Sequence, residues 1–138
     1  MRSFVAAVFA LTAIVPLHQG AVQDEGAIKA VFQSVEQALA SGAVGEIRRS
    51  LGDQVTMNIE RQDFGYISAN QATSVLNEYF AVRKPTGFSF SKIDTQAQGP
   101  FATGRLDYVR QGARGSSQVY LSLTRRDSTW VVSQFNIY

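Results

Sequence analysis

The sequence predicts an α+β protein in which N-terminal helices pack on a curved, mostly antiparallel sheet. In the first part of the chain apolar residues recur three and four positions apart, as on one face of a helix. In the later part they alternate with polar residues, which is typical of half-buried strands. Because the connections between these later strands are short, consecutive strands are expected to pair as a meander. Helices followed by a run of strands indicate the α+β class.

Two helices are predicted before the first strand. The longer one covers Asp24 to Ala40, with Asp24 as its N-cap and Gly42 just beyond its end. Its apolar face is formed by Ile28, Val31, Phe32, Val35 and Leu39. A shorter helix continues this spacing over residues 44–51, and we expect Gly52 to stop it.

A third helix is predicted after the first hairpin. It opens with a capping box, in which the Ser68 hydroxyl accepts a hydrogen bond from the backbone of Gln71 and the Gln71 side chain reaches back. Its apolar face is formed by Ala72, Val75, Leu76, Tyr79 and Phe80. Pro85 is expected to end it, since proline disfavours a helical residue before it.

The predicted strands are residues 55–60, 66–67, 88–95, 101–110, 118–125 and 129–138, and residues 111–116 form a glycine-rich hairpin tip. Since side chains alternate between the two faces of a strand, each strand presents one set of residues towards the helices. These sets are Val55, Met57 and Ile59; Ala102, Gly104 and Leu106; Val119, Leu121 and Leu123; and Val131, Ser133, Phe135 and Ile137.

Residues 1–21 are predicted to be a secretory signal peptide. Arg2 precedes an apolar run from Phe4 to Val15, and small residues follow near its end. A membrane span needs about 20 apolar residues, more than this run offers. Cleavage after Gly20 or after Ala21 fits equally, and residues 22–138 then form a single domain in the periplasm or outside the cell.

The composition excludes several chemistries. The chain has no cysteine, and its single histidine, His18, leaves with the signal peptide. Zinc sites of the Cys/His type, cysteine nucleophiles and Ser-His-Asp relays therefore require residues that are missing, and we expect no metal ion and no cofactor. The 13 basic side chains barely outnumber the 11 acidic ones, which argues against a nucleic-acid partner.

The order of elements resembles the nuclear transport factor 2-like (cystatin-like, cone-shaped) fold, and more closely a family of small exported bacterial proteins of uncharacterised function within it. The matching segments are the Ile28 to Leu39 helix, Leu51 leading into Val55-x-Met57-x-Ile59, Tyr66-Ile67-Ser68 before Ala72-x-x-Val75-Leu76, Ala102-Thr103-Gly104-Arg105-Leu106, Val119-Tyr120-Leu121-Ser122-Leu123, and Trp130 to Ile137. The resemblance covers nearly all of the chain after the signal peptide and implies no catalytic residue.

The predicted interior of the cone holds no acid. Its polar candidates are Tyr79, Tyr108 and Ser133, whereas the acids Glu60, Asp94 and Asp107 fall on the opposite face or near strand ends. An isomerase of the ketosteroid type needs a carboxylate base beside a donor such as tyrosine, so enzymatic activity is the weakest alternative. Ala102 and Gly104 either leave a cavity or let a helix pack closely, and close packing is favoured.

The opposite sheet face is predicted to bind a partner. It carries tyrosine and arginine among short polar residues, a composition that protein interfaces favour. The candidates are Arg105, Tyr120, Asn136 and Tyr138. We therefore predict a non-enzymatic exported module that forms a homodimer or binds an envelope protein. The alternative is a carrier of a small apolar ligand held in the cone near Tyr79 and Tyr108.

Overall fold

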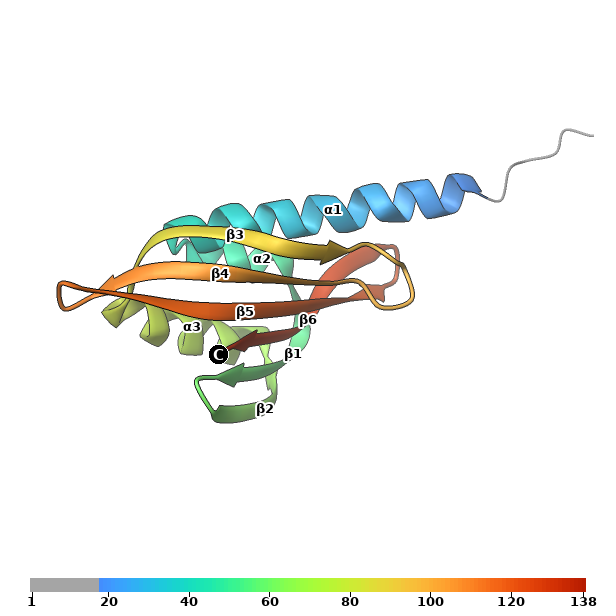
Figure 1. The fold of residues 1–138 in the computed structure, drawn as a ribbon. Coiled ribbons are helices and arrows are strands. Elements are labelled where there is room, and N and C mark those ends of the chain that lie inside the picture. Colours follow the sequence, from blue (N-terminus) through green and yellow to red (C-terminus); the bar gives the residue numbers. More distant parts are fainter. Residues whose placement is uncertain (1–17) are drawn as a thin grey trace, which may run out of the picture.

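The computed structural model describes residues 18–138, which form three helices and one six-stranded sheet (Figure 1). In chain order the elements are α1 (His18–Ser41), α2 (Val44–Ser50), β1 (Leu51–Ile59), β2 (Gln62–Ser68), α3 (Ala69–Val82), β3 (Lys84–Asp94), β4 (Phe101–Arg110), β5 (Ala113–Arg126) and β6 (Thr129–Ile137). The predicted apolar run of the signal peptide lies outside the described residues. Within them, no helix combines the length and the apolar character needed to cross a membrane.

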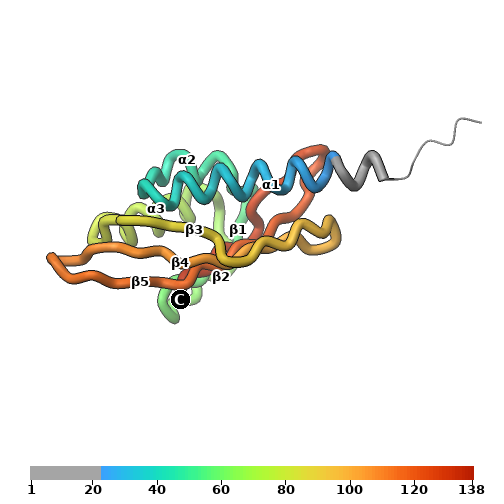
Figure 2. Tube along the Cα trace, turned by 45° about the horizontal axis from the view of Figure 1, so that its top comes forward, coloured from blue at the N-terminus to red at the C-terminus, as the bar shows by residue number. Residues whose placement is uncertain are grey.

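The sheet has the strand order β2-β1-β6-β5-β4-β3. The last four strands form the predicted meander, and β1 pairs with β2 in an antiparallel hairpin. The closing strand β6 returns to lie parallel to β1, in the middle of the sheet. The predicted class, helices packed on a curved and mostly antiparallel sheet, is therefore confirmed. Both the tube trace and the ribbon show the three helices on one side of the sheet (Figures 1 and 2).

The first helix begins earlier than its spacing predicts. Asp24 does not cap it, because α1 already starts at His18. The Asp24 carboxylate instead accepts a hydrogen bond of 3.4 Å from the Trp130 indole and lies 3.9 Å from the Arg125 guanidinium. Asp24 thus ties α1 to the end of β5 and the start of β6.

The third helix begins as predicted. The Ser68 hydroxyl accepts a 3.1 Å hydrogen bond from the Gln71 backbone, and the Gln71 side chain accepts one of 3.0 Å from the Ser68 backbone. The helix ends at Val82, but β3 begins at Lys84 instead of at the predicted Phe88. Proline is tolerated here because β3 is an edge strand, in which every other backbone N–H faces away from the neighbouring strand and makes no ladder bond. Similarly, Gly52 lies inside β1 and does not end α2.

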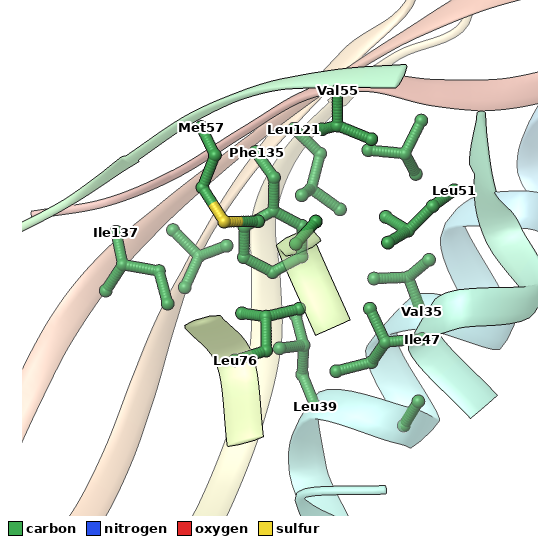
Figure 3. Packing of buried hydrophobic residues seen from close by; sticks show 14 of the residues in the cluster. Val35, Leu39, Ile47, Leu51, Val55, Met57, Leu76, Leu121, Phe135 and Ile137 are labelled. Carbon is green, nitrogen blue, oxygen red and sulfur yellow. The ribbon is translucent and has the colours of Figure 1, made fainter. Parts of the chain in front are cut away.

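The core lies between the helices and the inner face of the sheet. Leu39 from α1 and Leu76 from α3 point towards Met57, Leu121 and Phe135 from the sheet (Figure 3). Phe32, Val35, Ile47 and Val55 are also fully buried. The alternation predicted for β1, β4 and β5 is the one observed, because the side chains predicted to face the helices are buried in all three strands.

The predicted phase of β6 is wrong in its first half. Trp130 and Val132 face the core, followed by Phe135 and Ile137, so the alternation shifts by one position. The cause is a bulge at Ser133: Leu123 pairs with Val132 and Ser122 pairs with Gln134. The extra residue reverses the direction of every side chain before it.

Candidate functional site

The structure brings together two of the three predicted interior residues, Tyr79 and Tyr108. Tyr79 lies on α3 and is buried, and its hydroxyl makes a 2.9 Å hydrogen bond with the hydroxyl of Ser117 on β5. The rings of Tyr79 and Tyr108 meet edge to face, with their centroids 6.4 Å apart. Tyr108 covers Gly115 on the paired strand, where a Cβ would come within 2.6 Å of its ring. The inner face therefore ends in a small cluster of hydroxyls and aromatic rings.

Ser133, the third candidate, does not join this cluster. Because of the β6 bulge it faces away from the core, where its hydroxyl accepts a 2.9 Å hydrogen bond from Thr124. The sequence alone could not reveal this change of phase, since the residues around Ser133 continue an alternating pattern in either register.

A buried cation, Arg83, completes the cluster. Its side chain is only 8% exposed, and its guanidinium lies 4.2 Å from the centroid of the Tyr79 ring and 5.7 Å from that of Tyr108. Its Nη2 donates to both carboxylate oxygens of Glu60, at 2.7 and 2.8 Å. The sequence analysis missed Arg83. The signal that could have found it is its position four residues after Tyr79, on the same face of the helix end.

Glu60 brings a carboxylate to the edge of the predicted acid-free interior. It lies in the turn between β1 and β2, as its place at a strand end suggested, but its side chain reaches Arg83. Glu60 has a φ of 48° and Arg61 one of 73°, so two non-glycine residues in this turn adopt the left-handed conformation. Such conformations are unfavourable for residues with a Cβ and persist where surrounding contacts hold them.

Burial raises the pKa of the Tyr79 hydroxyl, whereas the hydrogen bond with Ser117 and the charge of Arg83 oppose that rise. Tyr79 is therefore a neutral phenol at physiological pH. In that state its hydroxyl is hydrogen-bonded to that of Ser117 and offers no basic group. The cluster can therefore donate hydrogen bonds and bind a charged group.

An open recess of about 220 Å³ lies beside Arg83, between α3 and the β1–β2 hairpin. Three apolar side chains, one amide and three charged groups are among the residues that line it: Ile59, Phe64, Val75, Gln62, Glu60, Glu78 and Arg83. Among residues 18–138, no group of three or more His, Cys, Asp or Glu side chains is placed to hold a metal ion.

Gly104 is covered by strand β3, and not by a helix as predicted. A Cβ at this position would come within 2.5 Å of the Ser89 carbonyl oxygen and 2.7 Å of the Phe88 ring. The missing side chain therefore admits a neighbouring aromatic ring and backbone, and the space is filled.

Three of the four predicted outer-face residues lie on the neighbouring strands β4, β5 and β6, and Tyr138 directly follows β6. Asn136 pairs with Tyr120, and Tyr138 exchanges two backbone hydrogen bonds with Gln118, which pairs with Arg105. The Tyr120 ring stacks on that of Phe101 from β4, with centroids 6.0 Å apart and an interplanar angle of 23°. We call Arg105, Tyr120, Asn136, Tyr138 and Phe101 the outer patch.

The members of the outer patch differ in exposure. Tyr138 is 66% exposed, whereas Asn136 is buried and donates a 3.2 Å hydrogen bond to the Tyr138 hydroxyl. The Oδ1 atom of Asn136 has no hydrogen-bond partner. Arg105 donates to Asp107 at 2.9 Å, next to an open groove of about 590 Å³ that runs towards the tip of the β4–β5 hairpin.

Solved structures with little sequence similarity share this architecture. A protein from Shewanella oneidensis described as NTF-2 like and of unknown function has a TM-score of 0.61 at 13% identity, over 85% of this chain and 98% of that one. A ketosteroid isomerase-like protein from Erwinia carotovora atroseptica has a TM-score of 0.65 at 11% identity, over 83% and 95%. The helices and curved sheet therefore have the nuclear transport factor 2-like fold.

Among proteins with this fold, members of one family are similar to this chain. A DUF4783 family protein from Bacteroides uniformis has a TM-score of 0.70 at 20% identity, over 76% of this chain and 93% of that one. One from Bacteroides fragilis has a TM-score of 0.68 at 21% identity, over 75% and 93%. The family described as "Domain of unknown function (DUF4783)" matches residues 32–138, and the chain belongs to this family. A search of curated proteins found no match to the chain. The resemblance to a family of uncharacterised function with this fold is therefore confirmed.

Proposed function

We propose that this protein is an exported, non-enzymatic module that binds a second copy of itself through the outer patch. The observation that carries the proposal is the aromatic stack of Phe101 and Tyr120, which lies on the sheet face that none of the helices within residues 18–138 covers (Figures 1 and 2). Exposed Tyr138 lies opposite Gln118, two residues along β5 from Tyr120. Aromatic side chains are enriched at the centres of protein interfaces because they bury a large area at a small cost in conformational entropy.

The charges of the outer face support a second copy as the partner. Arg105 is neutralised by Asp107 on its own strand, and Lys92 lies 5.3 Å from the centroid of the Phe101 ring. The pairing of Arg105 with Asp107 reduces the repulsion between like charges that two copies of this face would meet at a two-fold interface. A different envelope protein as the partner is the competing outcome of the test below.

The interior cluster supports a binding role over catalysis. An isomerase of the ketosteroid type uses an acid shielded from water beside a phenol. Here Glu60, which reaches the cluster through Arg83, is 41% exposed and bound by that arginine, and the Tyr79 hydroxyl is bonded to Ser117. The apolar-ligand alternative has less support, because the Arg83 guanidinium lies against both tyrosine rings and makes this place polar.

Sedimentation equilibrium tests the proposal. The double variant Tyr120→Ala with Arg105→Ala should raise the dimer dissociation constant at least about tenfold, since central aromatic and arginine residues carry most interface energy. The matched control is Val82→Ala, which truncates a half-exposed apolar side chain on the helical side of the molecule. A wild-type protein that sediments as a monomer at high concentration would refute self-association and leave another partner for the same face.

A further inference from the structure

An open groove of about 590 Å³ lies on the outer face of the sheet, beside the β4–β5 hairpin. Asp107 of β4 lies between Gly87 of β3 and Ser116 of β5, its direct partners in the two antiparallel ladders. Directly opposed residues point to the same face of a sheet, and Leu106, the neighbour of Asp107, faces the core. Because glycine has no side chain and that of serine is short, the half-exposed Asp107 carboxylate stands in a hollow. The volume of the groove is within the range of small-molecule sites.

Two arginines line this groove together with Asp107. Arg105 donates its Nε–H to one oxygen of the Asp107 carboxylate, 2.9 Å away, so these two charges largely neutralise each other. Arg114 is exposed and pairs with Val109, which makes it the diagonal neighbour of Asp107 on β5. No ion pair within residues 18–138 involves Arg114. The three charged side chains therefore leave the groove with a net positive charge, and Arg114 carries it.

The groove also offers hydroxyl groups and an acceptor for the hydroxyls of a ligand. Thr86 and Ser116 bring exposed hydroxyls, which both donate and accept hydrogen bonds. Asp107 has a second carboxylate oxygen, which can accept hydrogen bonds in addition to the one from Arg105. Val109 adds a half-buried apolar side chain opposite Arg114. This set of groups matches a ligand that is rich in hydroxyls and carries negative charge.

We propose that this groove binds an acidic oligosaccharide, a short chain of sugars that carry carboxylate groups. A sugar carboxylate accepts parallel N–H bonds from the Arg114 guanidinium, the arrangement in which arginine binds carboxylates best. Sugar hydroxyls donate to Asp107 and exchange hydrogen bonds with Thr86 and Ser116. An acidic peptide lacks these hydroxyls and would place its carboxylates near Asp107, and a neutral sugar would leave the charge of Arg114 unused. The groove borders the outer patch at Arg105, but the proposal does not depend on self-association.

Titration calorimetry with matched probes tests the class of ligand. Short oligomers of galacturonate, mannuronate and glucuronate supply both carboxylates and hydroxyls. Their methyl esters keep the hydroxyls without the charge, and oligoglutamate of equal length keeps the charge without the sugars. At least one acidic oligosaccharide should bind about tenfold more tightly than its methyl ester and than oligoglutamate, because each comparison probe loses one set of hydrogen bonds. Equal binding of the methyl esters, or no binding of any acidic oligosaccharide, would overturn the proposal. Equal binding of oligoglutamate would overturn it in favour of an acidic peptide.

Arg114 and Arg126 lie at opposite ends of β5 and provide a matched pair of variants. Both side chains are exposed, so Arg114→Gln and Arg126→Gln remove the same charge without disturbing the core. Arg114→Gln should weaken the best-binding acidic oligosaccharide about tenfold and leave its methyl ester unchanged, whereas Arg126→Gln should change neither affinity. Equal weakening in both variants would indicate attraction by net charge alone and would contradict the proposal, as would full affinity in Arg114→Gln.

The position of the bound oligosaccharide supplies a second readout. It should shift the backbone amide NMR signals of Thr86, Val109 and Ser116, and shifts confined to another region would show that the groove is not the site. Sedimentation of the same samples separates this site from the function proposed above. A dimer that forms without any oligosaccharide binding would refute the groove site alone, and a monomer that binds the oligosaccharide would refute self-association alone.

Discussion

The hydroxyls of Tyr79 and Ser117, 38 residues apart in the chain, share a buried hydrogen bond of 2.9 Å that joins α3 to β5. Both residues are almost completely shielded from water. The bond lies where the helix crosses the end of the sheet, and it satisfies two polar groups that would otherwise be stranded in the core. Its presence makes the stability of the fold depend on the protonation of one phenol.

Replacing Tyr79 by phenylalanine should remove that dependence. Burial raises the pKa of Tyr79 in the folded state, so above a pH of about 10 the unfolded chain loses its proton first and stability falls. The stabilising contribution is complete below the unfolded pKa and is lost as the pH rises through the folded one. Urea unfolding from about pH 8 to about pH 11 should show this fall in wild type and a flatter curve in Tyr79→Phe.

The matched control is Tyr138→Phe, because Tyr138 is 66% exposed. It should keep the wild-type alkaline slope. At neutral pH, Tyr79→Phe should also cost about 1–3 kcal/mol, since it leaves the Ser117 hydroxyl buried without this partner. An alkaline slope that survives in Tyr79→Phe would show that another group causes it.

Gly104→Ala should destabilise the sheet by about 1–3 kcal/mol in the free energy of unfolding, a typical cost of overpacking. The added Cβ would lie 2.5 Å from the Ser89 carbonyl oxygen, a backbone atom that cannot move without disturbing the β3–β4 pairing. Gly45→Ala is the control: nothing lies within 4 Å of its Cβ position, and in helix α2 alanine should stabilise by about 0.5–1 kcal/mol. Equal unfolding midpoints for the two variants would contradict the packing described for Gly104.

Ser68→Ala should cost about 1 kcal/mol by removing the capping box of α3. Thermal unfolding measures the loss, and amide hydrogen exchange should accelerate first at Gln71, whose N–H loses its acceptor. Ser74→Ala on the same helix is the control, because its exposed hydroxyl bonds only to the Asn70 carbonyl. If both serine variants unfold at the same temperature, the cap contributes nothing measurable.

Most elements of the fold were predictable because local periodicity and capping signals act over a few residues. The capping box at Ser68 and the alternation in β1 are examples, and both appear in the structure as predicted. The start of α1 and the start of β3 were not predictable. In the sequence Asp24 has the form of an N-cap whether or not a helix begins there, and Pro85 has the form of a loop residue whether or not it lies in an edge strand. Each of these residues takes its role from a distant contact or from an edge position in the sheet.

The candidate site was predictable only in part. The spacing on α3 directed Tyr79 to the core, and alternation directed Tyr108 to the same face. The prediction for Ser133 was wrong because a bulge depends on how two strands pair, and the pattern of a single strand does not contain that information. The ion pair of Arg83 with Glu60 was missed because the two residues lie on different elements and look like ordinary surface charges in the sequence.

The sequence by itself determined the α+β class, the order of helices and strands, and most of the buried positions, because apolar periodicity records which side of each element avoids water. Only the tertiary structure decided which polar groups meet. It paired Glu60 with Arg83 and Tyr79 with Ser117, and it turned Ser133 outward, since these arrangements depend on strand register and on where the end of α3 crosses the sheet. The physical reason is the distance in sequence over which each effect acts. Hydrophobic patterning depends on residues within one element, whereas a buried polar contact depends on the three-dimensional packing of several elements at once.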